Sequence, residues 1–599
     1  MEKKYLRIPK KEAWIIKNLD NVIEKNGRIV SDARFVFVPI VCSEENYRKI
    51  EDLLNNSEIM AVSENELSPE LKLKVNEIIK KNNLKDLLRE SFDDKEINKI
   101  KSSYDIVGDI AIIEIDKEFL DKKEIIGNAI LKSNPHVKTV LMKKGKHKGV
   151  FRIQKYDYVC GENKLETMHK ENGILLKLKV DEAYFSVRMG SERKRILKQV
   201  KKQEDVLVMF SGIGPYSIEI AKKTSARTVY GVELNPNGQK YSIINKFLNK
   251  AWNFLPILGD VKKVAKSFYS YSFGLKSSLE QKELNVKLNN QINPDFAVIE
   301  LMLRHEDLAN NVNETHNIKN LLSTIDRLKS LGKNISLHMP MPFRFKSLRD
   351  YLAELKMLGK IAKEKQCLIV VHLPPKEIIK KNEQLRIVLE KFSDYFYYEN
   401  LITQEFLTTC KDFLEFKDFV KNVCVDISHL GLVLRTMDKV KYEIEKFRDN
   451  FNCYFHLNNY YKKKDSFDLD KGELNINELS DMLTFGVVEV RNRDENLASE
   501  MLNSFKWISK KKKTFDRILM PLPKDGEHFL DDALSLIKDE GIIHFYDFLH
   551  EKDFDRAIQK IKNACEENSF NFKILNFVKC GQHSPRTFRI CVDFQVFKV

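Results

Sequence analysis

The stretch Asp205–Lys223, DVLVMFSGIGPYSIEIAKK, decides the fold class of this chain. It predicts a buried strand, then a turn containing Gly212 and Gly214, then a helix. Glycines let the backbone approach a ligand, and a helix N-terminus favours negative charge. Alone the pattern is a weak functional signal, because many strand-to-helix turns contain two glycines.

Two further apolar segments, Ala226–Pro236 (ARTVYGVELNP) and Trp252–Asp260 (WNFLPILGD), continue the pattern. This alternation of strands and helices indicates a parallel sheet with helices on both faces. Glu233 and Asp260 end the two segments, at the edge where such sheets bind nucleotides. We expect Glu233 to hold ribose hydroxyls and Asp260 to lie within reach of a base, although either acid could instead cap a helix.

The pattern breaks at residues 268–290, which are polar and predict a linker. Beyond it come new strand–helix units with the strands DFAVIELML, NISLHMP, CLIVVHLP, DYFYYENL, NVCVDISHLG, CYFHLNN and GVVEVRN. The block 268–508 is about 240 residues long, close to the size of a (β/α)₈ TIM barrel. The segments FDRILMPLP, GIIHFYDF and TFRICVDFQVF then resume the first sheet.

Polar side chains stand at the ends of the strands in this block, where a TIM barrel has its catalytic face. They are His338, His372, Glu399, Asp426, His429, His456 and Glu489. A single histidine here is more often a core residue, but seven such side chains on successive strand ends predict a metal site. Imidazole and carboxylate ligands suit zinc, manganese, iron or magnesium.

Composition narrows the class of protein. The 599 residues are 32% charged and 43% hydrophobic, and 102 Lys and Arg against 87 Asp and Glu give a net charge of +15, which suits a nucleic-acid partner. No stretch reaches the ~18 consecutive apolar residues of a membrane span, and the N-terminus lacks the apolar core of a signal peptide. The nine cysteines are scattered, with no CxxC pair. We therefore expect a cytoplasmic protein with free thiols.

Several segments together resemble the archaeal and eukaryotic type of tRNA (guanine-37-N1)-methyltransferase. They are FRIQKYDYVCGENKLETMHKENG, AYFSVRMGSERKRI, FSGIGPYSI, VELNP and FDRILMPLP, with LRIPKKEA and SYDIVGDIAIIEI nearer the N-terminus. The resemblance implies a multi-domain α/β protein with a discontinuous Rossmann-like S-adenosylmethionine methyltransferase domain at 166–267 and 509–599. An N-terminal tRNA-binding domain would occupy 1–60, a small α+β domain 61–165, and the inserted barrel 268–508.

The resemblance also implies a reaction: methyl transfer from S-adenosylmethionine to N1 of guanosine 37, next to the tRNA anticodon. Glu192 matches the general base for the N1 proton, and Arg152 matches the arginine that stabilises charge on the guanine O6. The matched donor-pocket positions are Tyr184, Arg188, Phe210, Gly212, Gly214, Glu233, Asp260 and Pro523. Glu192 could instead pair within its helix with Arg188 or Arg195, and Arg152 could contact phosphate.

Two positions depart from that family's pattern. Val208 stands where the family has an aspartate, and Pro521 stands where it has an asparagine. Proline offers no side-chain amide and no N–H, so we expect altered base positioning and donor affinity, and slower, altered or lost methyl transfer. The basic runs Lys143–Lys148 and Lys510–Lys513 fit phosphate contacts to the anticodon stem-loop and outer corner of tRNA, although either could be a solvated surface.

The middle block resembles the xylose isomerase-like, or apurinic-endonuclease-like, TIM barrels, through the D-x-x-H of Asp426 and His429 and the HLN at His456. In DLDKGEL, Asp468 and Asp470 stand where those families have D-x-H. The implied cofactor is a divalent metal: Zn, Mn or Mg. Sugar isomerases and phosphodiester hydrolases both occur among such barrels, so the reaction stays open. A two- or three-metal cluster would favour phosphodiester hydrolysis, whereas mono- or dinuclear Mn or Mg with a sugar would favour isomerisation.

The barrel is inserted after Asp260 and its helix. Helix-to-strand connections of a doubly wound sheet lie at the edge opposite the donor crevice, so we expect the barrel to leave tRNA access open. Three functions remain: guanosine-37 methylation, a wyosine-pathway aminocarboxypropyl transferase, and a degenerate tRNA-binding platform that carries an active barrel. Glu192 favours the first, whereas Val208 and Pro521 favour the third.

Overall fold

The structure is a computed structural model that describes residues 4–10, 29–31, 33–40, 60–63, 84–89, 91–278, 298–308, 318–340, 347–490, 499–522 and 524–599. The chain divides into two units. One comprises Met1–Asp105, Ile110–Met142 and Asp157–Asn163, and the other comprises Ile106–Asp109, Lys143–Tyr156 and Lys164–Val599. Among the described residues, no helix is both long and apolar enough to cross a membrane.

Two small sheets lie towards the N-terminus of the chain. One has the order β2 (Val30–Ser31), β3 (Phe35–Ile40), β1 (Lys4–Pro9), β4 (Met60–Ser63). The other has the order β5 (Asp105–Val107), β6 (Ile110–Ile113), β7 (Thr139–Lys148), β8 (Ile153–Gly161). The helices α3 (Leu84–Leu88), α4 (Asp94–Lys99) and α5 (Lys123–Ser133) belong to the same part of the chain. β5 and β6 lie within the segment SYDIVGDIAIIEI.

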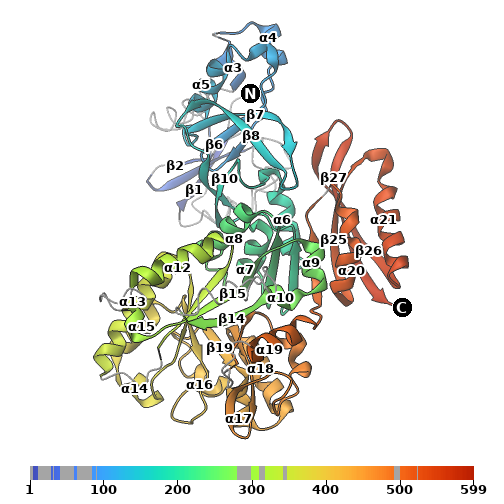
Figure 1. Ribbon diagram of the computed structural model, residues 1–599. Coiled ribbons are helices and arrows are strands. Elements are labelled where there is room, and N and C mark those ends of the chain that lie inside the picture. The colour runs from blue at the N-terminus through green and yellow to red at the C-terminus, as the bar shows by residue number, and fades with distance from the viewer. Residues whose placement is uncertain are drawn as a thin grey trace. The chain divides into compact units, whose positions relative to one another are not determined.

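The second unit contains the predicted doubly wound sheet (Figure 1). Its seven strands are ordered β13 (Phe254–Leu258), β12 (Thr228–Glu233), β11 (Asp205–Met209), β24 (Phe515–Met520), β25 (Ile537–His550), β27 (Thr587–Lys598), β26 (Phe570–Ser584). The first five strands are parallel, and β27 is antiparallel to both of its neighbours. The chain thus leaves the sheet after β13 and returns to it at β24.

The helices of this sheet form two groups, one for each face. The first group is α6 (Gly190–Leu197), α7 (Pro215–Lys223) and α8 (Pro236–Asn249), and the second is α9 (Val261–Lys266), α20 (Leu530–Leu536) and α21 (Asp555–Glu567). α7 and α8 each begin with proline, which suits the first helical turn because proline has no N–H to satisfy. Local sequence therefore fixes where these helices start, directly after the carboxyl ends of β11 and β12.

Between β13 and β24 the chain forms a closed barrel of eight parallel strands (Figure 1). In order they are β14 (Phe273–Ser278), β15 (Val298–Met302), β16 (Asn334–His338), β17 (Leu368–Val371), β18 (Phe396–Glu399), β19 (Asn422–Asp426), β20 (Asn452–Leu457) and β23 (Gly486–Val488). The helices that connect them are α12 (Ile318–Ser330), α13 (Leu348–Lys365), α14 (Lys376–Lys381), α15 (Glu383–Lys391), α16 (Cys410–Leu414), α17 (Ile427–Leu434) and α18 (Met437–Asn450). The predicted eight-stranded barrel is confirmed.

The predicted linker at 268–290 is wrong in its first part. Residues Phe268–Ser272 form helix α10, and Phe273–Ser278 form β14, the first strand of the barrel. β14 pairs with β15 on one side and with β23 on the other, and so closes the barrel. The segment FGLKSS is short and polar at its end, so its composition alone did not distinguish it from a loop.

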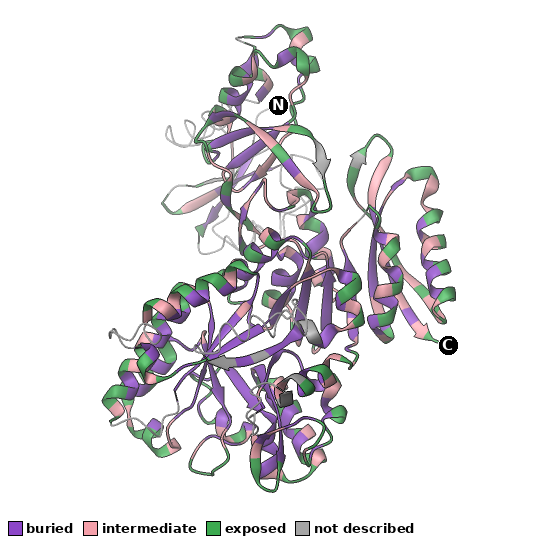
Figure 2. Ribbon diagram, in the orientation of Figure 1, coloured by how far each residue is buried: buried purple, intermediate pink, exposed green. Residues whose placement is uncertain are grey.

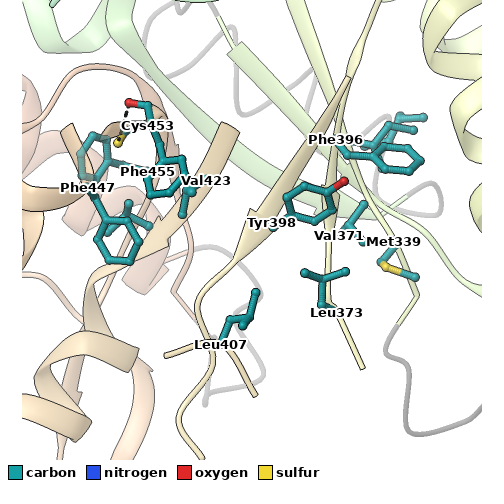
Figure 3. Packing of buried hydrophobic residues seen from close by; sticks show 14 of the residues in the cluster. Met339, Val371, Leu373, Phe396, Tyr398, Leu407, Val423, Phe447, Cys453 and Phe455 are labelled. Atoms are coloured by element: carbon teal, nitrogen blue, oxygen red, sulfur yellow. Dashed lines mark hydrogen bonds between the residues drawn. The ribbon is translucent and has the colours of Figure 1, made fainter. Parts of the chain in front are cut away.

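Alternate residues of the barrel strands face opposite ways, as the two-residue period of a strand requires. Figure 3 shows part of the layer between strands and helices: Val423 of β19 lies near Phe447 of α18, and Val371 of β17 lies beside Tyr398 of β18. Tyr397, which directly precedes Tyr398 in β18, faces the other way and belongs to a second core. Figure 2 shows that the barrel strands are buried along their length and that the exposed residues lie on the outer helices.

The amino-terminal end of the barrel is closed by the seven-stranded sheet and α8. Tyr397 and Phe485 of the barrel share one continuous apolar core with Leu207 and Ile257 of the sheet. Polar contacts also join the two: Asn334 donates to the carbonyl of Pro256 (2.9 Å), and Tyr230 donates to the carbonyl of Thr484 (3.0 Å).

A buried ion cluster reinforces this junction. Asp205, at the start of β11, lies 3.0 Å from Lys513 Nζ, 3.7 Å from Arg448 of α18 and 3.7 Å from Arg227. Lys513 is 1% exposed, so the prediction that it contacts tRNA phosphate is wrong: its amine faces the barrel junction. Asn334 begins β16 and Thr484 lies just before β23, so the sheet contacts the amino-terminal ends of the barrel strands. The carboxyl ends of these strands therefore lie at the far end of the barrel from the sheet.

Candidate functional site

The glycine turn after β11 has the backbone of a ligand-binding loop. Phe210, Gly212 and Gly214 have φ angles of 60°, 58° and 87°. Left-handed backbone is strained at Phe210, which has a Cβ, and such strain persists where the surrounding structure imposes it. The Phe210 ring packs edge-on against Phe529, with ring centroids 4.8 Å apart.

The acid at the end of β12 lies directly beside this turn. Glu233 accepts a hydrogen bond from the Gly212 N–H (2.6 Å) and another from the Asn235 N–H (2.7 Å). Burial raises the pKa of Glu233, while these backbone donors favour its charged form. Glu233 and Gly212 therefore meet at the carboxyl edge of the sheet, as predicted.

Asp260 stands one strand further along the same edge. Its carboxylate accepts from the Lys262 N–H (2.8 Å) and caps α9, which is the structural role that the sequence left open. Capping uses one oxygen, Oδ1, so the second oxygen stays available to a ligand. Tyr184 is 41% exposed, its carbonyl oxygen adjoins Gly212, and its hydroxyl accepts from Arg589 (3.2 Å).

Arg152 reaches the same edge from outside the sheet. Its Nη2 donates to the Lys524 carbonyl (2.5 Å) and lies 3.3 Å from Asp525, just after β24. Pro521, in the same segment, is central to a tight turn in which the Leu522 N–H donates to the Met520 carbonyl (2.7 Å). Pro523 lies outside the described residues, and Arg188 lies in the short 3₁₀ helix Val187–Met189 that precedes α6 and Glu192.

Glu192 is buried within the domain. Arg195 donates to both of its oxygens (2.7 Å each), so the ion pair that the helical spacing allowed is present. The Tyr546 hydroxyl of β25 also donates to Glu192 Oε1 (2.8 Å). Sequence reasoning missed Tyr546, because it lies 354 residues from Glu192 along the chain.

At the far end of the barrel, the polar side chains predicted at the strand ends converge. Three overlapping sets have ligand atoms within 4.8 Å of one another: Glu300, His338 and His456; His338, His372 and Glu399; Glu399, Asp426, His456 and Glu489. Six of the eight predicted metal residues belong to these sets. Glu300 was not predicted, because it lies inside the apolar strand β15 rather than at its end.

Glu399 belongs to two of these sets. Its Oε2 lies 3.2 Å from His338 Nε2 and 2.7 Å from His372 Nε2. Its Oε1 faces the other way, 3.5 Å from His456 Nδ1 and 3.7 Å from His429 Nδ1. One carboxylate is thus shared by two groups of ligand atoms, as a bridging ligand between two metal ions would be.

Several ligand atoms in the cluster lack hydrogen-bond partners. His456 Nδ1 and Glu489 Oε2 are buried 2.6 Å apart, yet neither makes a hydrogen bond, and His372 Nδ1 and Glu300 Oε1 are also unsatisfied. Buried polar atoms normally find partners. The donor set of imidazole and carboxylate groups, with these unsatisfied atoms, fits a divalent metal such as Zn, Mn or Mg.

The electrostatics of the cluster favour ionised carboxylates. Burial disfavours charge on Glu399, but His372 and His456 and the hydrogen bonds from His338 and His372 hold its pKa well below the ordinary value. Lys276 of β14, which sequence reasoning missed with its strand, donates to Glu489 (2.6 Å). Burial opposes charge on Lys276, but Glu489 and Glu300 raise its pKa above that of a free lysine.

His429 lies at the margin of the cluster, 3.7 Å from Glu399 Oε1 and 3.7 Å from Asp426 Oδ1. His429 Nδ1 is 2.8 Å from the Asn400 carbonyl, and its Nε2 is 3.7 Å from Asp465. Burial opposes its charge, but Asp426 and Asp465 raise the pKa of His429 to about 10. Asp468 is buried and pairs with Lys471 (3.1 Å), and it belongs to none of the converging sets found in the described residues.

A doubly wound sheet with a glycine turn and an acidic strand end at its carboxyl edge is typical of a Rossmann-like domain that binds a nucleoside-containing ligand. The family model described as "TRM5/TYW2 methyltransferase domain" matches residues 167–271 and 489–575, and the "TYW2 N-terminal domain" matches residues 84–164. The first of these matches covers the two parts of the chain that flank the barrel.

Three curated relatives agree with these matches. The chain is 35% identical over 301 residues to "tRNA (guanine(37)-N(1))/4-demethylwyosine(37)-methyltransferase Taw22" of Nanoarchaeum equitans, across 49% of this chain and 93% of that protein. It is 34% identical over 249 residues to "tRNA (guanine(37)-N(1))-methyltransferase Trm5b" of Methanocaldococcus jannaschii, across 41% of this chain and 70% of that protein.

A protein of the latter name from Pyrococcus abyssi is 44% identical over 165 residues, across 28% of this chain and 49% of that protein. The chain belongs to the TRM5/TYW2 methyltransferase family. It is accordingly an enzyme of the transferase class.

Proposed function

We propose that this enzyme methylates N1 of guanosine 37 in tRNA, with S-adenosylmethionine as donor. The relatives from Methanocaldococcus and Nanoarchaeum carry that activity in their names. The observation that carries the proposal is the meeting of Gly212 and Glu233 at the carboxyl edge, with Arg152 and the buried Glu192 contributed by segments on either side. The net charge of +15 suits a tRNA partner.

Each residue of the site has a role in this reaction. Glu233 is held by two backbone N–H groups, so its free lone pairs are aimed at ribose hydroxyls. Glu192 receives the N1 proton of guanine as the new bond forms at N1. Arg152 donates towards charge that grows on O6, after exchanging its present contacts with Lys524 and Asp525 for the substrate. S-adenosylmethionine supplies an electrophilic methyl group, and its sulfur keeps the electron pair of the bond that breaks.

The remaining donor-pocket assignments belong to the same proposal. Tyr184, Arg188, Phe210, Gly214 and Asp260 would line the donor site beside Gly212, and Pro523 would close it. We further propose that the methyltransferase domain spans residues 166–267 and 509–599 and that the barrel domain spans residues 268–508.

Val208 and Pro521 depart from the family's pattern, so the test must measure whether the enzyme forms a methylated nucleoside at all. Val208 is fully buried in β11, so it presents no polar group to the donor. The direct test is mass spectrometry of the nucleosides of an unmodified tRNA transcript after incubation with enzyme and donor. The proposal expects 1-methylguanosine with a G37 transcript and none with a matched A37 transcript, and Glu192→Gln should slow the reaction at least 100-fold. Absence of a methylated nucleoside would refute it.

A wyosine-pathway activity is the alternative for the same site, since the Nanoarchaeum relative is named for 4-demethylwyosine as well as guanosine. A transcript carrying 4-demethylwyosine at position 37, tested in parallel, separates methyl transfer to that base from methyl transfer to guanosine. Transfer of an aminocarboxypropyl group would appear as a larger mass increase. The third alternative, a tRNA-binding platform, predicts tRNA binding without any product.

A second candidate function is a metal-dependent activity of the barrel, and the shared carboxylate Glu399 favours it. We propose that His338, His372 and Glu399 hold one divalent ion and that Glu399, Asp426, His456 and Glu489 hold another, with His429 and Asp468 adjacent. Such ions polarise oxygens and activate water. We propose phosphodiester hydrolysis as the reaction of such a centre, and sugar isomerisation, which also occurs in xylose isomerase-like barrels, is its alternative.

Metal analysis of the purified chain tests this second candidate. Inductively coupled plasma mass spectrometry should find about two equivalents of divalent metal, and Glu399→Gln should lose most of both, because the shared ligand serves each ion. Glu405→Gln, at a position on the barrel that no converging ligand set contains, is the matched control. Wild-type protein without stoichiometric metal, after supply with Zn, Mn and Mg, would refute the candidate.

A further inference from the structure

The position of Glu192 depends on groups that the proposed mechanism has not used. Glu192 Oε1 accepts from Arg195 Nη2 (2.7 Å) and from the Tyr546 hydroxyl (2.8 Å). Oε2 accepts only from Arg195 Nε (2.7 Å) among the described contacts. The carboxylate is therefore held in one orientation, and Oε2 keeps a lone pair for a proton.

Arg195 is shared between two carboxylates. Its Nη1 and Nη2 donate to Asp593 of β27 at 2.5 and 3.0 Å, while its Nε and Nη2 serve Glu192. A single guanidinium charge thus faces two negative groups. Without Asp593, the whole of that charge would stabilise the Glu192 carboxylate and make it a weaker base.

Asp593 is itself fixed by a dense set of donors. His544 Nδ1 lies 2.7 Å from Asp593 Oδ1, and His544 Nε2 lies 2.8 Å from Arg517 Nη1. Arginine can only donate, so His544 Nε2 must accept and Nδ1 must carry the proton that is given to Asp593. Burial lowers the pKa of His544, in agreement with a neutral ring.

Further donors complete the shell of Asp593. Gln199 and Asn576 donate at 3.0 and 3.1 Å, and Cys591 lies 3.2 Å away. Burial opposes the charge of Asp593, but His544 and Arg195 hold its pKa far below the ordinary value. His544, Cys591 and Asp593 also lie close enough to bind a metal. The Asp593 oxygens, however, already accept from Arg195 and the other donors.

Tyr546 is oriented in the same way. Its hydroxyl lies 3.1 Å from the Tyr216 hydroxyl of α7 and donates to Glu192, so Tyr216 can donate to it. The charged and titratable groups around Glu192 are therefore Arg195 on its own helix, Tyr216 on α7, Tyr546 and His544 on β25, and Cys591 and Asp593 on β27. Of these, Tyr546 and Arg195 touch the Glu192 carboxylate.

We propose that Tyr546 and Arg195 are positioning residues for Glu192, and that Asp593 maintains its basicity by drawing away part of the charge of Arg195. The inference rests on the proposed role of Glu192 as the base in methyl transfer. In the step concerned, the N1–H bond of guanine breaks, its proton moves to Glu192 Oε2, and the N1 electron pair forms the bond to the methyl carbon. The bond from that carbon to the donor sulfur breaks at the same time, and the sulfur keeps its electron pair. Arg195 stays paired with Asp593 after the proton has moved. It therefore keeps its own position and continues to hold the neutral Glu192 side chain.

Tyr546 and Asp593 should affect the pH dependence of the reaction in opposite directions. Tyr546→Phe removes a donor to the Glu192 carboxylate, so the acid limb of the single-turnover rate should move up by about one pH unit. Asp593→Asn leaves the charge of Arg195 to Glu192 alone, so the acid limb should move down by a similar amount. In both variants the rate constant at pH 7.5 should fall about 10-fold, with donor affinity unchanged.

The experiment measures single-turnover methyl transfer to a G37 transcript from pH 5.5 to pH 9, with donor affinity from calorimetry. Tyr230→Phe is the matched control, because Tyr230 is buried in the same domain but donates to Thr484 at the barrel junction. If Asp593→Asn fails to fold, Tyr546→Phe carries the test alone. Acid limbs that stay at the wild-type pH, or move in the same direction in both variants, would overturn the inference. Lack of any wild-type product would instead refute the proposed function.

Discussion

Lys246 of α8 is buried at the junction with the amino-terminal end of the barrel, and its burial predicts how the stability of the protein changes with pH. Lys246 is 2% exposed and lies beside a cavity lined by Leu255 and Phe247 on one side and by Val298 and Phe485 on the other. It forms no ion pair with any described residue, and its nearest ring centroid, that of Phe485, is 5.4 Å from Nζ. Burial lowers the pKa of Lys246 to about 7.

The magnitude follows from proton linkage. A free lysine titrates near 10.5, so between pH 7 and pH 10.5 the unfolded chain binds a proton that the folded chain has lost. Stability therefore rises with pH in this window, by about 1.4 kcal/mol per pH unit. The folded protein should gain about 2 to 3 kcal/mol between pH 7.5 and pH 9.5 from this one group.

Lys246→Met replaces the amine by an apolar group of similar length, so it should remove this pH dependence and stabilise the protein by up to about 4 kcal/mol at pH 7. For a unit of this size that corresponds to roughly 1 °C per kcal/mol in Tm. Differential scanning calorimetry at pH 7.5 and pH 9.5 measures both effects. Lys240→Met, on the exposed side of the same helix, should change neither. A Lys246→Met protein with the wild-type pH dependence would refute the burial of this lysine at the junction.

Three further predictions concern the junction, the donor edge and the barrel. Asp205→Asn leaves three cations around an uncharged amide and should destabilise the unit by about 3 to 5 kcal/mol, measured as a lower Tm. Pro521→Asn should raise the rate of methyl transfer severalfold, because an amide at this turn can donate to the target base; a slower variant would contradict this. Removal of metal with a chelator should lower the Tm through repulsion between Glu399 and Glu489, yet leave the rate of methyl transfer within about twofold.

The parts of the fold that local sequence could predict are those with a strong period or a turn signal. The glycine turn at Gly212, the acid at Glu233 and the strand ends of the barrel all follow directly after apolar strands. Such signals lie within a few residues of one another. They could therefore be found without knowledge of tertiary structure.

The missed features depend on contacts that are distant in sequence or on atypical strands. β14 was taken for a linker because FGLKSS is short and polar, and Lys276 was missed with it. Glu300 lies within an apolar strand, and its partners there, Lys276, His456 and Ser336, are distant in sequence. The groups around Glu192 that were missed, Tyr546 and Asp593, come from β25 and β27, more than 350 residues away. Lys513 seemed a surface charge in a basic run, but its partner Asp205 lies 308 residues distant.

The central claim is that the carboxyl edge around Gly212 and Glu233 binds the methyl donor. Isothermal titration calorimetry of the full chain with S-adenosylmethionine tests it most directly. We predict one donor molecule per chain with a dissociation constant in the micromolar range, weakened at least 10-fold by Glu233→Ala. No binding at millimolar donor, or equal affinity in the Glu233→Ala protein, would contradict it.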